Sequence, residues 1–200
     1  MPFEYSERKK PIFLRRTISF RNLGFIYQSL NLNYEIGGSF DFDKKGKFLR
    51  SQLYPVNKLG NEIVLPDSLS VEFHTHPSRR LVQMPSLTDL IAQAKRSINN
   101  PKKFRNKYAQ YRGALAIVFN HFGAITYKYN KKTLPTAKQK KEILWILISL
   151  KKDSIPNLTK QAKALESYGF EISIQTWAKI KKSGLYLKFC SRRYHRVAEE

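Results

Sequence analysis

Cysteine is nearly absent from this 200-residue sequence, in which Cys190 is the only one. A single thiol cannot form a disulfide within the chain, so a fold built on internal disulfide crosslinks is excluded. Long apolar runs are also lacking, because the longest mainly apolar run, 143–150, is far shorter than the roughly 20 residues that span a bilayer. The first residues lack the apolar centre of a signal peptide. We therefore expect an intracellular protein without a membrane partner, because reducing compartments disfavour disulfides.

Acidic residues are scarce as well. The sequence contains 15 Asp and Glu against 37 Lys and Arg, which gives a formal net charge of +22. A charge of this size bears on partners and solubility rather than on the fold. It predicts a nucleic acid, an acidic protein surface or an anionic assembly as a partner. A cytoplasmic or nuclear location, or a place in a viral or other large assembly, is consistent with it.

The remaining composition, 42% hydrophobic, is sufficient for a buried core. Alternating or apolar patterns predict strands at 11–20, 33–42, 48–54, 69–74, 113–120, 124–129, 170–174 and 184–189. Helical spacing predicts helices near 23–30 and 86–98, one ending near 150 and one ending near 169. This order predicts an α/β protein with a mixed β-sheet flanked by helices. We expect one domain over 1–134, followed by a basic C-terminal α+β extension or small module over 135–200.

Two histidines, His74 and His76, end one of the predicted strands. Side chains two residues apart on a strand point the same way, so both imidazoles could contact one metal ion. Pro77 then stops strand pairing and begins a loop. The alternative is a polar strand end with no ligand role.

A carboxylate begins the helix that follows. Ser86 and Asp89 have the spacing of a capping box, with Ser86 as N-cap and Asp89 in the third helical position. That arrangement explains both residues without any catalysis. However, a strand end with two imidazoles facing a helix start with one carboxylate also supplies three ligands. Two histidines, one carboxylate and an open position form the ligand set of a catalytic zinc site.

A glutamate upstream could serve such a site as an acid and base. Glu35 shares one face of the predicted strand 33–42 with Gly37, Ser39 and Asp41. Glycines within a strand indicate a bulge or a close backbone approach. The alternative for Glu35 is a solvated carboxylate on the strand.

Taken in order, these segments resemble the JAMM motif of the MPN/JAB zinc metalloprotease family. The similarity covers about residues 12–128 and rests on Glu-x-x-Gly at Glu35, then His-x-His-Pro, then Pro-Ser-x-x-Asp. It implies that His74, His76 and Asp89 bind zinc, that Glu35 activates the zinc-bound water, and that Ser86 helps to hold the tetrahedral intermediate. The segment between His76 and Asp89 is two residues longer than in the common pattern. This departure affects the loop and the fit of a substrate more than metal ligation.

The resemblance implies a deubiquitinase-like isopeptidase, with ubiquitin or a ubiquitin-like conjugate as its substrate. A second hypothesis is a basic JAB-fold protein that binds nucleic acid or an acidic assembly, with hydrolysis secondary or absent. The stretches 102–112 and 181–196 support it, because they mix lysine and arginine with tyrosine and phenylalanine. Such mixtures bind phosphates and stack on bases, although a solvated lysine-rich surface has the same composition.

Overall fold

The computed structural model describes residues 12–32, 34–42, 47–54, 71–77, 84–99, 115–149 and 154–191. Its strands are β1 (Ile12–Ile18), β2 (Gly37–Phe42), β3 (Phe48–Tyr54), β4 (Val71–Thr75), β5 (Ala116–Asn120), β6 (Gly123–Tyr129), β7 (Phe170–Thr176) and β8 (Leu185–Ser191). Its helices are η1 (Phe20–Leu23), α1 (Gly24–Ser29), α2 (Leu87–Asn99), α3 (Ala137–Ile148), α4 (Ile155–Glu166) and α5 (Trp177–Ser183).

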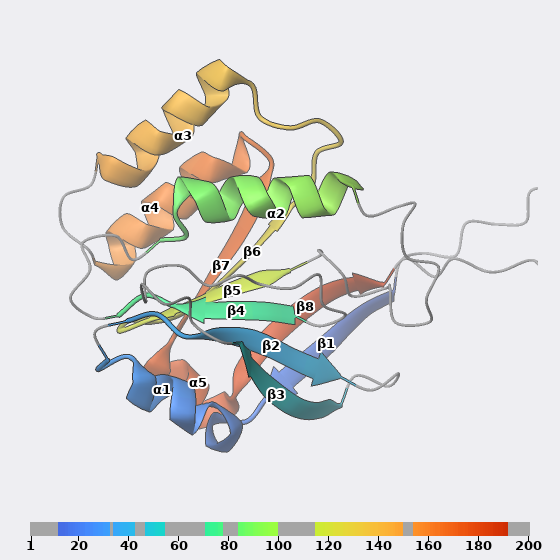
Figure 1. The fold of residues 1–200 in the computed structure, drawn as a ribbon, viewed down its shortest axis with the longest axis vertical. Coiled ribbons are helices and arrows are strands. Elements are labelled where there is room, and N and C mark those ends of the chain that lie inside the picture. The colour runs from blue at the N-terminus through green and yellow to red at the C-terminus, as the bar shows by residue number, and fades with distance from the viewer. Residues whose placement is uncertain are drawn as a thin grey trace, which may run out of the picture.

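The strands form a six-stranded sheet in the order β3-β2-β4-β5-β6-β7 and a two-stranded ribbon of β1 and β8. Within the sheet, β4 and β5 run parallel, and the other described pairs are antiparallel. Helices α2, α3 and α4 lie over one face of the sheet, and η1, α1 and α5 lie on the opposite side (Figure 1). The expectation of a mixed sheet flanked by helices is therefore confirmed.

Each face of the sheet has its own hydrophobic cluster. The cluster that includes η1, α1, α5 and the ribbon buries Ile18, Leu23, Ile26, Leu30, Phe40, Phe42, Val71, Phe73, Leu115, Ile117, Phe119, Ala124, Trp177, Ile180, Leu185 and Leu187. The cluster beneath α2, α3 and α4 buries Met84, Leu90, Ala94, Ala116, Val118, Ile125, Tyr127, Tyr129, Ile143, Leu147, Leu158, Ala162, Leu165 and Phe170. Alternation along the strands divides the side chains between the two clusters.

Phe73 anchors the central strand β4 in the first of these clusters. Its ring is fully buried, stacks on Phe40 at 4.4 Å between centroids and meets Phe119 edge-on at 5.8 Å. Burying one such side chain contributes about 2–3 kcal/mol to folding. Because neighbouring residues on a strand point to opposite faces, this anchor directs Glu72 and His74 toward α2.

Gly38 allows the strand next to β4 to approach closely. A Cβ atom at this position would lie 2.0 Å from the carbonyl oxygen of Gln52 and 2.8 Å from the Phe73 ring. Any side chain would therefore push β3 or Phe73 out of place. The close backbone approach expected from the glycines of this segment is confirmed here, and a register irregularity between Asp41 and Phe42 follows in the same strand.

One local prediction was wrong, and one helix was not predicted. Strand β2 begins at Gly37, so Glu35 precedes the strand instead of sharing a face with Gly37. Helix α5 was not predicted, because its seven residues are too few for a helical period to stand out. Its boundaries do carry signals: the Thr176 side chain accepts a hydrogen bond from Lys179 N at 3.3 Å, and Gly184 ends it with a positive φ of 77°.

The segment after residue 134 supplies one strand to each sheet. β7 pairs with β6, and β8 pairs with β1. The expected boundary at 134 and 135 therefore lies in the connection between β6 and α3, with hydrogen-bonded strands on both sides of it. Among the described residues, no helix combines the length and the apolar character needed to cross a membrane.

The buried ring of Phe73 gives a stability prediction. We expect Phe73→Ala to lower the free energy of unfolding by about 3–5 kcal/mol, because it removes buried contacts and leaves a cavity. Leu53→Ala on β3 is the matched control, since Leu53 is 57% exposed and should change stability by less than about 0.5 kcal/mol. Urea unfolding followed by circular dichroism measures both values. Equal stability of the two variants would contradict the role of Phe73 as an anchor.

Candidate metal centre

Strand β4 presents both histidines to the α2 side of the sheet. His74 lies within β4 and pairs with Gly37 of β2 and Val118 of β5. His76 follows the strand, and its backbone N–H donates to the carbonyl of Phe119 at 2.7 Å. Both imidazoles are buried, with 6% and 5% of each residue exposed. Because Gly37 has no side chain, nothing from that position occupies the space beside the His74 ring.

The start of helix α2 holds Asp89 opposite these rings. Ser86 Oγ accepts a hydrogen bond from Asp89 N at 3.2 Å, and Asp89 Oδ2 accepts one from Ser86 N at 2.7 Å. These two bonds form the predicted capping box, in which backbone donors at the helix start are satisfied reciprocally. They also fix the Asp89 carboxylate at the helix end nearest the histidines. The structure thus shows the cap and the candidate ligand as one arrangement.

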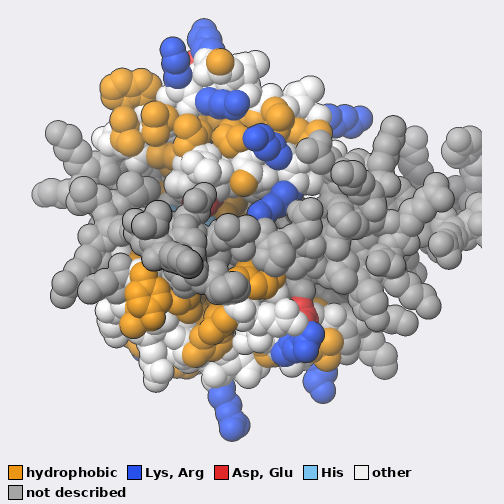
Figure 2. Space-filling view, in the orientation of Figure 1, with side chains coloured by type: hydrophobic (Ala, Val, Ile, Leu, Met, Phe, Trp, Pro, Cys, Tyr) orange, Lys and Arg blue, Asp and Glu red, His pale blue; other side chains and the backbone are white. Residues whose placement is uncertain are grey.

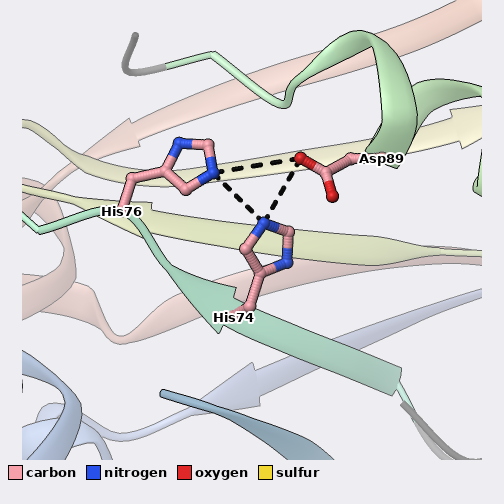
Figure 3. A group of neighbouring side chains, drawn as sticks. All are labelled: His74, His76 and Asp89. Atoms are coloured by element: carbon pink, nitrogen blue, oxygen red, sulfur yellow. Dashed lines mark hydrogen bonds and ion pairs between the residues drawn. The ribbon is translucent and has the colours of Figure 1, made fainter. Parts of the chain in front are cut away.

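Three atoms converge at this point (Figure 3). His74 Nε2 lies 3.3 Å from His76 Nε2 and 3.4 Å from Asp89 Oδ2, and His76 Nε2 lies 3.9 Å from the same oxygen. Ligand atoms on a tetrahedral ion with bonds of about 2.1 Å lie about 3.4 Å from each other. The spacing therefore matches three corners of such a tetrahedron, and these three side chains could hold a metal ion.

The electrostatics of the centre favour a cation. Burial would raise the pKa of Asp89, but the neighbouring His74 imidazole and the hydrogen bond from Ser86 hold it well below its usual range. Burial lowers the pKa of His74, yet the Asp89 carboxylate, with Glu35 and Glu72 adding to it, leaves that pKa raised. Negative charge therefore outweighs desolvation at the His74 imidazole, which favours a positive charge there.

Glu35 lies beside the histidine segment although it is outside β2. Thr75 N donates to the carbonyl of Ile36 at 2.8 Å, and Ile36 N donates to Thr75 Oγ1 at 2.9 Å. These bonds continue from the pairing of Gly37 with His74 and hold the residue after Glu35 beside the histidine segment. The charge of Glu35 acts on the pKa of His74 as well. The structure therefore brings Glu35 near the three candidate ligands.

A second ion pair joins the two ligand-bearing elements. Arg96, two turns along α2 from Asp89, donates through Nη1 to Oε2 of Glu72 on β4. Glu72 lies two residues before His74 on the same face of the strand and is 8% exposed. This Arg96–Glu72 pair, named here the α2–β4 tether, links the helix of Asp89 to the strand of His74.

Tyr127 on β6 lies in the same layer, 3% exposed. Burial first, and then the charges of Asp89 and Glu72, raise its pKa well above its usual value, so the phenol stays neutral. Sequence reasoning missed the residues behind the ligands. The available signal was the alternation of β4, which puts an acidic residue at 72 on the same face as His74.

The α2–β4 tether predicts an effect on metal affinity. We expect Arg96→Met to weaken the binding of added zinc, the probe ion, about tenfold, because α2 loses its link to β4 and the candidate ligand Asp89 moves away from the histidines. The direction of the change in affinity distinguishes positioning from charge, since removal of a positive charge near the site would by itself strengthen the binding of a cation. Competition with a chromophoric chelator measures the dissociation constant.

Lys95→Met is the matched control, because Lys95 is the exposed neighbour of Arg96 on α2. This substitution removes the same positive charge from the helix. Arg96→Lys should restore part of the affinity, since a cation is returned to the tether. Zinc binding by Arg96→Met as tight as that of the unmodified protein would contradict a positioning role for the pair.

Comparisons with known proteins give no match for this chain. No protein-family model matches the sequence, and no curated protein and no solved structure matches it either.

Proposed function

We propose that this protein is a zinc-dependent metallo-isopeptidase of the JAMM type on an MPN/JAB-like fold. The observation that carries the proposal is the convergence of His74 Nε2, His76 Nε2 and Asp89 Oδ2 at distances of 3.3–3.9 Å. Two imidazole nitrogens and one carboxylate oxygen suit zinc, whereas magnesium and calcium prefer oxygen ligands. Three protein ligands leave the fourth tetrahedral position for water or substrate.

Glu35 is the proposed proton carrier. A bound zinc ion supplies a Lewis acid for a carbonyl oxygen and lowers the pKa of water to about 7. Glu35 takes one proton from the attacking water and delivers it to the leaving amine. The hydroxyl adds to the carbonyl carbon, the carbon–nitrogen bond breaks, and the products are a carboxylate and a free amine. Two hydrogen bonds hold the neighbouring residue Ile36 beside Thr75, and the charge of Glu35 acts on His74, which supports this assignment.

Ser86 is the proposed donor to the oxyanion. Its Oγ accepts from Asp89 N at 3.2 Å, which leaves the hydroxyl proton available for another acceptor. A donor aimed at the developing oxyanion typically lowers the barrier by about 3 kcal/mol. The capping bond thus orients the hydroxyl beside the candidate ligand Asp89.

The substrate assignment comes from the motif. Glu35, His74, His76, Ser86 and Asp89 occur in the order of the JAMM pattern, and that family commonly cleaves lysine isopeptide bonds. We therefore infer ubiquitin or a ubiquitin-like conjugate as the substrate.

Glu35→Gln tests the mechanism. We expect hydrolysis of diubiquitin to fall by about 10²–10⁴-fold, because the amide side chain cannot accept the water proton. Zinc content should stay unchanged, since Glu35 is not among the proposed ligands. Gel-based cleavage rates and metal analysis by mass spectrometry measure the two quantities on the same sample.

Glu166→Gln is the matched control, because Glu166 lies exposed at the end of α4. This variant should hydrolyse diubiquitin at the rate of the unmodified protein. Asp89→Asn should lose both zinc and activity. Cleavage that persists in Glu35→Gln, or in protein stripped of metal by a chelator, would rule out the proposed reaction.

A second function is favoured by the charge. The net charge of +22 exceeds what hydrolysis at one metal ion requires. Of the two basic-aromatic stretches, 102–112 lies outside the described residues, and the other begins on α5. There the Lys181 ammonium lies 4.5 Å from the centroid of the Tyr27 ring and 5.5 Å from that of Phe20. We therefore keep, as the alternative, a basic JAB-fold protein that binds nucleic acid, with hydrolysis secondary or absent.

Salt dependence separates this alternative from the enzyme. If the α5 lysines contact phosphates, the logarithm of the binding constant for a single-stranded oligonucleotide should fall with the logarithm of salt concentration. Its slope should be about −0.7 per phosphate contact. Lys181→Gln should reduce that slope by about 0.7. Fluorescence anisotropy over a salt series measures it, and binding that ignores salt would exclude this function.

A further inference from the structure

Helix α3 exposes an apolar surface on the layer that contains the metal centre. Among the described residues, Trp145 is 68% exposed, the highest value of any large hydrophobic side chain, and Leu144 and Ile148 are 43% and 48% exposed. Figure 2 shows hydrophobic side chains gathered over this part of the molecule, with lysine or arginine side chains beside them. Contiguous exposed apolar surface marks a place where another molecule binds.

The exposed side chains follow one line along the helix. Lys138, Lys141, Leu144, Trp145 and Ile148 are all exposed. Apart from the adjacent pair Leu144 and Trp145, successive members are three or four positions apart, which brings them onto one face. We name these five residues the α3 stripe. Its first turns are cationic and its last turn is apolar, so a partner must match two different chemistries along one helix.

The opposite side of α3 is fixed to the protein. Ile143 and Leu147 are buried in the same cluster as Leu90, which directly follows the candidate ligand Asp89. A capping box of Thr136 and Gln139 holds the start of the helix, with hydrogen bonds of 2.9 Å and 3.2 Å. The stripe is therefore a preorganised surface, which reduces the entropy lost when a partner binds.

Charge selects the partner. The one acidic residue of α3, Glu142, borders the stripe four positions after Lys138, but it is half-buried and accepts a hydrogen bond from the hydroxyl of Tyr168 at 3.1 Å. The stripe thus presents two lysines without a carboxylate among its members. A partner with carboxylates opposite the lysines gains attraction, whereas a cationic partner is repelled.

Two other occupants fit this surface less well. A second copy of the chain would bring two lysine-bearing stripes together and set one net charge of +22 against another. Single-stranded nucleic acid stacks its bases on aromatic planes, but the stripe offers one aromatic ring beside two aliphatic side chains. Aliphatic side chains next to an exposed tryptophan are instead the composition of a protein interface.

We propose that the α3 stripe is a docking surface for an acidic protein segment whose aliphatic side chains pack on Trp145 and whose carboxylates meet Lys138 and Lys141. The geometry of the stripe, straight and parallel to one helix, fits an amphipathic helix of the partner. This binding does not depend on hydrolysis, because none of the stripe residues is a candidate ligand or acid–base group. Its failure and the failure of the proposed enzyme are therefore separate results.

The test uses a helical peptide with leucines on one face and glutamates beside them. The chain has two tryptophans, and Trp177 is only 6% exposed, so a change of solvent exposure on binding is reported by Trp145. We expect the peptide to shift the tryptophan emission to shorter wavelength. A peptide with the same leucines and lysine in place of glutamate should leave the emission unchanged.

Variants then locate the binding. By anisotropy of the labelled peptide, Trp145→Ala should weaken binding about thirty-fold, as expected for a central interface tryptophan. Lys138→Gln combined with Lys141→Gln should weaken it about fivefold, since each exposed ion pair contributes modestly.

Lys179→Gln combined with Lys182→Gln is the matched control, because both lysines are exposed on α5 and the net charge falls equally. This control should bind within about twofold of the unmodified protein, as expected for charges outside the interface. Equal weakening by the two lysine pairs would show attraction to net charge alone and overturn the proposal. So would unchanged binding by Trp145→Ala, or an oligodeoxythymidylate that binds more tightly than the acidic peptide and is lost with Trp145→Ala.

Discussion

One oxygen atom, Oδ2 of Asp89, holds the candidate site together. It accepts the backbone N–H of Ser86 at 2.7 Å and lies 3.4 Å and 3.9 Å from the two imidazole nitrogens. The hydrogen bond from Ser86 fixes where α2 begins. The two imidazole contacts fix the start of α2 opposite His74 and His76. Because both depend on one atom, the position of α2 over β4 cannot change without changing the ligand geometry. The capping box that explains Ser86 and Asp89 without chemistry is thus also the device that aims the carboxylate.

Much of this could be predicted from local patterns. Alternation around Phe73 indicated that His74 faces away from the core of aromatic rings, and the Ser86 and Asp89 spacing indicated the helix start. What local patterns could not give is the distance between segments, because pairing register is set by the whole sheet. The ion pair of Glu72 with Arg96 could not be predicted for this reason, since it joins β4 to the far end of α2. The place of Glu35 was only partly predicted, because β2 begins at Gly37 and leaves Glu35 outside the strand.

Charge acts differently at long and at short range in this protein. The chain carries +22 overall, yet at the candidate metal centre the charges of Asp89, Glu35 and Glu72 all act on His74, with Arg96 paired to Glu72. At physiological ionic strength, interactions between exposed charges are largely screened beyond about 8 Å. The distant lysines would therefore repel a divalent cation only weakly, whereas the Asp89 carboxylate lies beside both imidazoles and the charges of Glu35 and Glu72 act on His74. Asp41 and Glu171 each pair with a basic side chain elsewhere, so the excess of positive charge remains on the surface.

The ribbon of β1 and β8 has a consequence for how the molecule is made. These strands come from opposite ends of the described chain, and Ile18 pairs with Leu185 while Ile12 pairs with Ser191. On a ribosome that adds roughly 5–20 residues per second, β1 waits many seconds before its partner strand emerges. Contacts so distant in sequence slow folding, because the chain entropy of closing the loop is lost before the contact forms. The histidines and the carboxylate are therefore synthesised long before the layer behind them is complete, and the phenylalanines of that layer lack part of their cover during that interval.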